Sequence, residues 1–204
     1  MIDLEVFVAD EQDDVAIDTT VWAQFVRSVL LAEGVKAPAE VSVLFVDEAA
    51  MSALHERFLG LSGPTDVLSF PLDGEFFAKT TAATGPVGHP KWRDDDVDEA
   101  LEEMPLALGD VIVCPSVAYR QAPQHAGSFD DEVALLLVHG ALHLLGHDHA
   151  QVAEREVMQA RERALLGTCW RPLPRDPWAE PFAAAESEQP GAVGDRDGEQ
   201  EAGV

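Results

Sequence analysis

Hydrophobic and polar positions repeat with two different periods along residues 1–170 of this chain. Alternating apolar and polar side chains predict strands, and apolar positions three or four residues apart predict amphipathic helices. Strands are expected at residues 2–8, 41–46, 66–70 and 108–113. Helices are expected at residues 21–33, 48–58, 115–122, 129–145 and 151–166. The irregular connections between these elements indicate an α+β fold, in which a small four-stranded mixed sheet packs with about five helices.

Two segments lack this periodicity. Residues 73–105 contain glycine, proline, threonine and the acidic run Asp94-Asp95-Asp96, which predicts a flexible acidic insertion. Residues 171–204 are rich in proline, alanine, glutamate and glycine, which predicts a disordered acidic tail. We therefore expect a single domain over residues 1–170 that contains the insertion and precedes the tail.

Composition indicates a globular cytoplasmic protein. The hydrophobic content of 47% excludes general disorder. The chain has no apolar run of the roughly 18 residues that a membrane span needs, and its start, Met1-Ile2-Asp3-Leu4-Glu5, lacks the basic residues of a signal peptide. The two cysteines, Cys114 and Cys169, are too few for a disulfide framework and lack the spacing of a zinc knuckle.

Four of the seven histidines lie in one run, HGALHLLGHDH, at residues 139–149. His139 and His143 are four residues apart, so they share one face of a helix. Gly146 can end that helix in a left-handed conformation and turn His149 back toward the first two rings. A single histidine on an apolar helix is more often a core residue, but three imidazoles at this spacing suit a catalytic zinc ion with its fourth position open to water. We expect the site in a cleft at the end of this central helix, with His147 lining the pocket or facing solvent.

The same spacing occurs in metzincin proteases, whose pattern H-E-x-x-H-x-x-G-x-x-H matches His139, His143, Gly146 and His149. Gly140 replaces the glutamate that serves the proteases as general base. General acid–base help contributes ~10²–10⁴-fold, so its loss disfavours a peptidase.

Phosphodiester hydrolysis suits the remaining groups better. A zinc ion lowers the pKa of its bound water to about 7 and acts as a Lewis acid on a phosphoryl oxygen. His139, His143 and His149 are therefore the catalytic candidates, acting through the metal-bound water. The formal net charge of −25 repels nucleic acid at long range, so a polyanionic substrate needs the local positive field that zinc with neutral ligands supplies.

The histidine run also resembles the H-G-x-L-H-L-x-G-Y-D-H signature of the YbeY family of bacterial rRNA maturation factors. Residues 63–71 resemble the family's P-T-D-V-L-S-F segment, and residues 108–112 resemble its L-G-D-I strand. Gln121-Ala122 falls on the family's Q-A pair, and Glu132 matches its glutamate seven residues before the first histidine. The order and spacing hold across residues 40–166, apart from the insertion.

This resemblance implies an α+β fold with one zinc ion at the floor of a cleft. It implies a metal-dependent endoribonuclease that acts on single-stranded RNA in small-subunit rRNA end maturation and ribosome quality control. The implied partners are rRNA and the ribosomal small subunit or its assembly factors, with no DNA and no membrane.

The chain departs from the family pattern at two positions. His147 replaces a tyrosine beside the site. Leu59 stands where many members carry an arginine that is proposed to contact RNA phosphate. Either Arg57 or another base such as Arg120 takes over this contact, or phosphate binding depends on zinc alone.

Asp66 and Ser69, together with Thr65, are further candidates for the cleft. Such polar residues also serve turns by bonding nearby backbone amides. Glu132 lies in the first turn of its helix, where the dipole favours any acid, but its spacing also permits contact with the His139 ring.

A second function from another class stays open. The chain could be a non-catalytic, zinc-containing ribosome-assembly factor, which the missing arginine favours. Three histidines without a fourth protein ligand argue against a closed structural zinc site. A metzincin-like peptidase is the third and weakest alternative.

Overall fold

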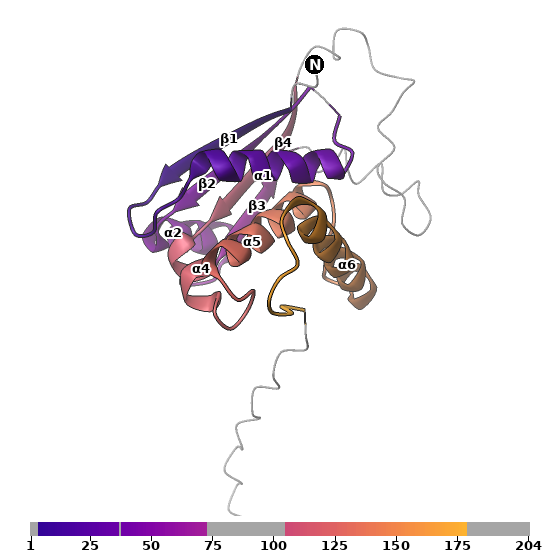
Figure 1. Cartoon of the computed structure of the whole chain (residues 1–204). Coiled ribbons are helices and arrows are strands. Elements are labelled where there is room, and N and C mark those ends of the chain that lie inside the picture. Colours follow the sequence, from indigo (N-terminus) through magenta and orange to yellow (C-terminus); the bar gives the residue numbers. More distant parts are fainter. Residues whose placement is uncertain (1–3, 37, 73–104, 179–204) are drawn as a thin grey trace, which may run out of the picture.

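The computed structural model describes residues 4–36, 38–72 and 105–178. The expected insertion therefore falls almost entirely outside the described residues, as does the part of the expected tail beyond Trp178. In the described part, four strands form one mixed sheet in the order β1-β2-β4-β3 (Figure 1). The strands are β1 (Leu4–Glu11), β2 (Ala39–Val46), β3 (Val67–Pro71) and β4 (Leu106–Val113). β1, β2 and β4 are parallel, and β3 pairs antiparallel to β4 at the edge.

Five helices accompany the sheet in the described ranges, which confirms the α+β prediction. They are α1 (Thr19–Ala32), α2 (Glu48–Leu59), α4 (Pro115–Gln121), α5 (Phe129–Leu144) and α6 (Val152–Cys169). The expected caps are in place, since the side chains of Asp18, Asp47 and Ser128 accept hydrogen bonds from the first turns of α1, α2 and α5. None of these helices combines the length and hydropathy needed to cross a bilayer.

Several elements are longer than the sequence predicts, because pairing with a neighbour extends them. β1 reaches Glu11 and β2 starts at Ala39, since the two strands pair in register from Leu4↔Ala39 to Glu11↔Val46. β4 begins two residues early and accommodates one extra residue, Leu108, where its register against β2 shifts. Local periodicity does not record such pairings.

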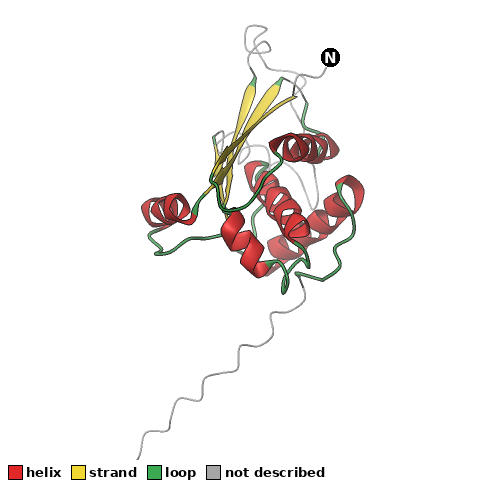
Figure 2. Ribbon diagram, turned by 60° about the vertical axis from the view of Figure 1, so that its left-hand side comes forward, coloured by secondary structure: helices red, strands yellow, loops and turns green. Residues whose placement is uncertain are grey.

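The two faces of the sheet carry different helices. Alternate residues of β2, such as Val43 and Phe45, belong to the main core with α1 and α5. Residues of the opposite face, Leu68 and Ile112, pack instead with Met51 of α2. In Figure 2, α2 stands on one side of the sheet and the other helices gather on the other side.

Helix α5 lies at the centre of the main core, with contacts to β3, β4, α1, α4 and α6. Most of its residues are buried, as its apolar sequence predicts. Gly140 is the point of closest approach to the sheet. A Cβ added there would lie 2.6 Å from Cγ1 of Val111 and 3.1 Å from Oγ of Ser69. Glycine therefore lets the histidine-bearing helix pack directly on β3 and β4.

Residues that follow α6 contact α5 and the main core. Asp131 in the first turn of α5 accepts hydrogen bonds from Trp170 Nε1 (2.9 Å) and Arg171 Nε (2.7 Å). Burial raises the pKa of Asp131, but bonds from Arg171, Ser128 and Trp170 outweigh it and bring that pKa below its usual value. Leu173 and Trp178 then pack against the main core. Residues 171–178 are thus packed on α5 and the main core at their Arg171, Leu173 and Trp178 side chains, and the domain boundary and tail expected from the sequence stay predictions.

Candidate metal centre

A tight turn after α5 brings the third histidine to the first two. Gly146 has φ 86°, the left-handed conformation that glycine adopts without strain. Its N–H donates to the carbonyl of His143 (3.0 Å), and the N–H of His147 donates to the carbonyl of Leu142 (3.0 Å). This pair of bonds is the Schellman motif that ends many helices. The chain reverses here, so His149 returns toward the helix face that carries His139 and His143.

The three imidazoles converge as the spacing predicts. Ring centroids lie 4.6 Å apart for His139 and His143, 5.4 Å for His139 and His149, and 5.0 Å for His143 and His149. One candidate ligand nitrogen from each ring lies within 4.8 Å of the others. Nitrogens at the usual zinc distance of about 2.0–2.1 Å on a tetrahedron would be roughly 3.3 Å apart, which is near this arrangement.

The hydrogen bonds of the imidazole rings show more directly than the ring distances whether these side chains suit a cation. Nδ1 of His139 lies 2.8 Å from Glu162 Oε1, and Nδ1 of His143 lies 3.0 Å from the carbonyl oxygen of His147. Both partners are acceptors, so both Nδ1 atoms carry the hydrogen. When both rings are neutral, the two Nε2 atoms, 3.1 Å apart, face each other with lone pairs. A cation between them removes this repulsion, and the donor set fits zinc.

Burial keeps His143 in the form that binds a metal. It lowers the pKa of His143 to about 4, and positive charge on His139 or His149 would lower it in the same direction. The imidazole is consequently neutral at physiological pH, with its Nε2 lone pair available.

Glu162 orients the His139 ring and was not identified from the sequence. Its carboxylate is only 4% exposed and accepts from His139 Nδ1 through Oε1 and from Trp178 Nε1 (2.5 Å) through Oε2. The guanidinium of Arg163 covers the Trp178 ring at 4.4 Å. One signal was present in the sequence: Glu162 lies four residues from both Met158 and Leu166, on the apolar face of α6.

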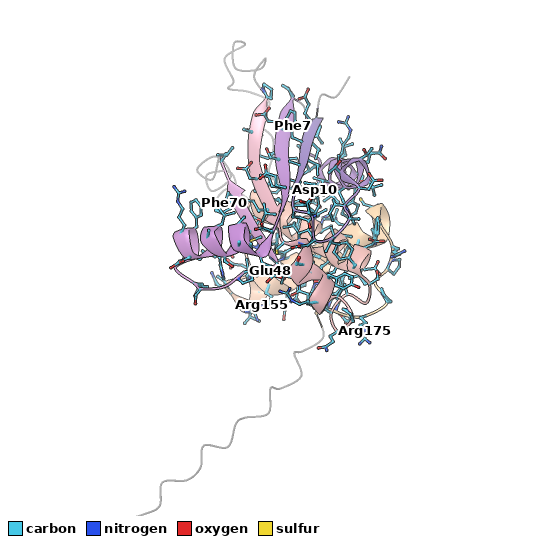
Figure 3. All side chains as sticks on the ribbon, turned by 90° about the vertical axis from the view of Figure 1, so that its left-hand side faces the viewer. Phe7, Asp10, Glu48, Phe70, Arg155 and Arg175 are labelled. Atoms are coloured by element: carbon cyan, nitrogen blue, oxygen red, sulfur yellow. The ribbon has the colours of Figure 1, made fainter. Side chains whose placement is uncertain are left out.

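The histidines open into a cleft of about 290 Å³. His139 and His149 line it together with Asp66, His125, Arg155 and Trp178. Figure 3 shows Arg155 at the helical end of the molecule, away from Phe7 on β1. The cleft therefore combines the candidate metal site with one arginine, one further histidine and an aromatic ring.

Asp66 takes both of the roles considered for it. Its Oδ1 accepts from the backbone of Val67 (2.9 Å) and the hydroxyl of Thr65 (3.1 Å), as expected of a turn. Its Oδ2 accepts from Gln121 Nε2 (2.7 Å), and the side chain lines the cleft. The spacing permitted a contact between Glu132 and the His139 ring, but Glu132 contacts His125 and Gln121. The carboxylate that contacts the His139 ring is that of Glu162.

The other sequence candidates lie outside the residues that line the cleft in the described part. Ser69 faces Gly140 at the packing contact between β3 and α5. Arg57 lies on α2, with its guanidinium 5.3 Å from the ring centroid of Phe58, and Arg120 forms an ion pair with Glu48 of α2. Neither arginine lines the cleft, whereas Arg155 of α6 does, although no sequence motif points to it.

His147 and Asp148 act on the turn itself. His147 is half-buried, and its backbone carbonyl accepts from the His143 ring. Asp148 accepts from the backbone N–H of His149 (2.7 Å), so its carboxylate stabilises the turn, and it forms no hydrogen bond to an imidazole within the described part of the chain.

These features define an α+β protein with a candidate three-histidine metal centre in a cleft. A family model described as Endoribonuclease YbeY matches residues 7–169. A curated Endoribonuclease YbeY of Frankia casuarinae is 42% identical over 166 residues, which cover 81% of this chain and 74% of the relative. The one from Acidothermus cellulolyticus is 42% identical over 170 residues, covering 82% and 92%. The chain belongs to the YbeY family.

Among solved structures, the solution structure of a Thermotoga maritima protein matches with a TM-score of 0.45 and 20% identity. The match covers 79% of this chain and 89% of that protein.

The contact between Glu162 and His139 predicts the effect of a single substitution. The negative charge of Glu162 holds the Nδ1–H of His139 and makes His139 Nε2 a better electron-pair donor to a cation. Glu162→Gln removes this charge. Loss of a hydrogen bond to a ligand ring typically weakens metal binding ~10–100-fold. We expect a loss of zinc affinity in this range for Glu162→Gln, measured by competition with a chelating dye. Glu156→Gln, the same change on an exposed position of α6, is the matched control. Equal zinc affinities of the two variants would contradict the assigned role of Glu162.

Proposed function

We propose that this chain is a zinc-dependent endoribonuclease that cleaves single-stranded RNA. Its role would be small-subunit rRNA end maturation and ribosome quality control in the cytoplasm, together with the small subunit or an assembly factor. The observation that carries the proposal is the convergence of three imidazoles, two with facing lone pairs, in the cleft of a chain from the YbeY family.

His139, His143 and His149 would hold the ion. Zinc bound by three neutral ligands keeps its double positive charge and supplies Lewis-acid stabilisation of a phosphoryl oxygen. Glu162 and the carbonyl of His147 fix the rings of His139 and His143 for this purpose.

Arg155 is the second source of positive charge in the cleft. The chain as a whole is strongly acidic, so an RNA phosphate is attracted only where cations are concentrated. A guanidinium forms charge-assisted hydrogen bonds to phosphate oxygens and stays protonated at all relevant pH values. We assign to Arg155 the phosphate contact that Leu59 cannot make.

Gly140 argues against a peptidase on grounds of packing as well as chemistry. The position faces Val111 and Ser69 in the contact between helix and sheet. A glutamate at this position would have to enter that contact, so the helix cannot carry the protease base in its present packing.

Replacing His143 tests the endoribonuclease. His143→Ala removes one ligand, and we expect cleavage of a single-stranded RNA oligonucleotide by the purified protein to fall about 10²-fold or more, equivalent to the several kcal/mol that a metal ion supplies. His55→Ala, on α2 outside the cleft, is the control and should cut at the wild-type rate.

Cleavage by His143→Ala at the wild-type rate would show that a contaminant produces the activity. If the wild type cuts no RNA with any metal, and metal removal unfolds it, the assembly-factor alternative is correct. Hydrolysis of casein by the wild type but not by His143→Ala would instead support the peptidase.

The two arginine candidates can be compared directly. Arg155→Gln removes a charge-assisted bond of about 1.5–3 kcal/mol, so kcat/KM for RNA should fall roughly 10–100-fold. Arg57→Gln should have a much smaller effect, because Arg57 lies against Phe58 on α2. Steady-state kinetics on one labelled RNA measure both. A larger loss in Arg57→Gln would move the phosphate contact to α2 and contradict the assignment to Arg155.

A further inference from the structure

A fourth histidine, His125, lines the same cleft as His139 and His149. It lies in the connection between α4 and α5, and its side chain is 41% exposed. Its Nδ1 lies 2.8 Å from Oε1 and 3.0 Å from Oε2 of Glu132. None of the roles assigned above uses this ring.

Glu132 acts as a buried hydrogen-bond acceptor. It is 0% exposed, and besides His125 it accepts from the backbone N–H of Ala126 (3.1 Å) and from Gln121 Nε2 (2.8 Å). Gln121 donates its other hydrogen to Asp66 (2.7 Å). Because every partner is a donor, His125 carries a hydrogen on Nδ1, and Nε2 is the nitrogen that exchanges protons with a bound molecule. No hydrogen bond to Nε2 is formed within the described part of the chain.

The charges that face His125 favour its protonated form. The hydrogen bond to Glu132 raises the pKa of His125, burial opposes this, and the charges of Glu132 on α5, Asp66 before β3 and Glu162 on α6 raise it further. Arg155 is the cation that lines the same cleft. The pKa stands above the ordinary imidazole value, so a protonated ring is available near neutral pH.

We propose that His125 donates a proton to the leaving ribose oxygen when the RNA phosphodiester is cleaved, and that Glu132 orients its ring. This inference rests on the proposed endoribonuclease function. The arrangement of a buried carboxylate, an imidazole held through Nδ1 and a free Nε2 at a cleft is that of an oriented acid–base catalyst. His125 lines the same cleft as His139 and His149, so its ring and the candidate metal ligands face one bound substrate.

The step balances without another reactant. The attacking hydroxyl oxygen, from water or the ribose 2′-hydroxyl, forms a bond to phosphorus and releases its proton to solvent. The bond from phosphorus to the leaving ribose oxygen breaks, and its electron pair stays on that oxygen. The oxygen takes the Nε2 proton of His125, and the ring regains a proton from solvent.

The test compares two substrates that differ in their need for an acid. The leaving group of RNA is a ribose alkoxide that must be protonated. The leaving group of bis(4-nitrophenyl) phosphate is a 4-nitrophenolate that needs no proton. His125→Gln of the full chain with zinc should cut RNA ~10²–10⁴-fold more slowly but hydrolyse the activated diester at a rate close to the wild type. His55→Gln should match the wild type on both substrates.

The pH dependence and the zinc content separate catalysis from structure. Wild-type RNA cleavage should fall as the pH rises through the raised pKa of His125, because the ring then lacks the proton it donates. His125→Gln should lack this alkaline decline, and Glu132→Gln should move it to lower pH by removing the carboxylate that raises the pKa. Both variants should retain the zinc stoichiometry of the wild type.

Two results would overturn the inference while leaving the endoribonuclease in place. One is RNA cleavage by His125→Gln at the wild-type rate. The other is an equal loss on both substrates or a loss of zinc, which would give His125 a structural role. If the wild type itself cuts no RNA, the proposed function fails and this inference fails with it.

Discussion

The close contact between α5 and the sheet at Gly140 is the constraint on which the rest of the site depends. No side chain larger than hydrogen fits at this position without moving Val111, since an added Cβ would lie 2.6 Å from its Cγ1. This contact directs the Gly140 side of the helix to the sheet and leaves His139 and His143 on a side that borders the cleft. The turn at Gly146 then ends the helix and brings His149 back toward the same side.

One candidate ligand ring, that of His139, is oriented by parts of the chain that are distant in sequence. Glu162 of α6 holds His139, Trp178 holds Glu162, and the segment that carries Trp178 is fixed to α5 through Asp131. Residues 170–178 thus complete a path of contacts from His139 of α5, through Glu162 and Trp178, back to Asp131 of α5. Changes at residues 170–178 should consequently alter the orientation of the candidate ligand His139, although these residues lie outside the histidine run. This path also explains why a buried carboxylate is tolerated on the apolar face of α6.

The sequence was sufficient wherever the information is local. The spacing of His139, His143 and Gly146 predicted the convergence of the imidazoles and the turn, because helix period and glycine conformation are properties of neighbouring residues. The four strands and five helices were located, with ends that differ where strands pair. Glu162 and Arg155 could not be placed, because their role arises only when α6 packs beside α5. Ser69, a candidate from the P-T-D segment, and Arg57, one alternative for the phosphate contact, lie outside the residues that line the cleft in the described part.

The central claim is that the three histidines hold one zinc ion, and metal analysis of the purified chain tests it most directly. Elemental mass spectrometry of protein prepared without added metal, and then titrated with zinc, measures the number of ions per chain. The account predicts one tightly bound zinc ion per chain for the wild type and its loss in His149→Ala, while His55→Ala keeps it. A stoichiometry near zero in the wild type after titration, or full retention in His149→Ala, would contradict it.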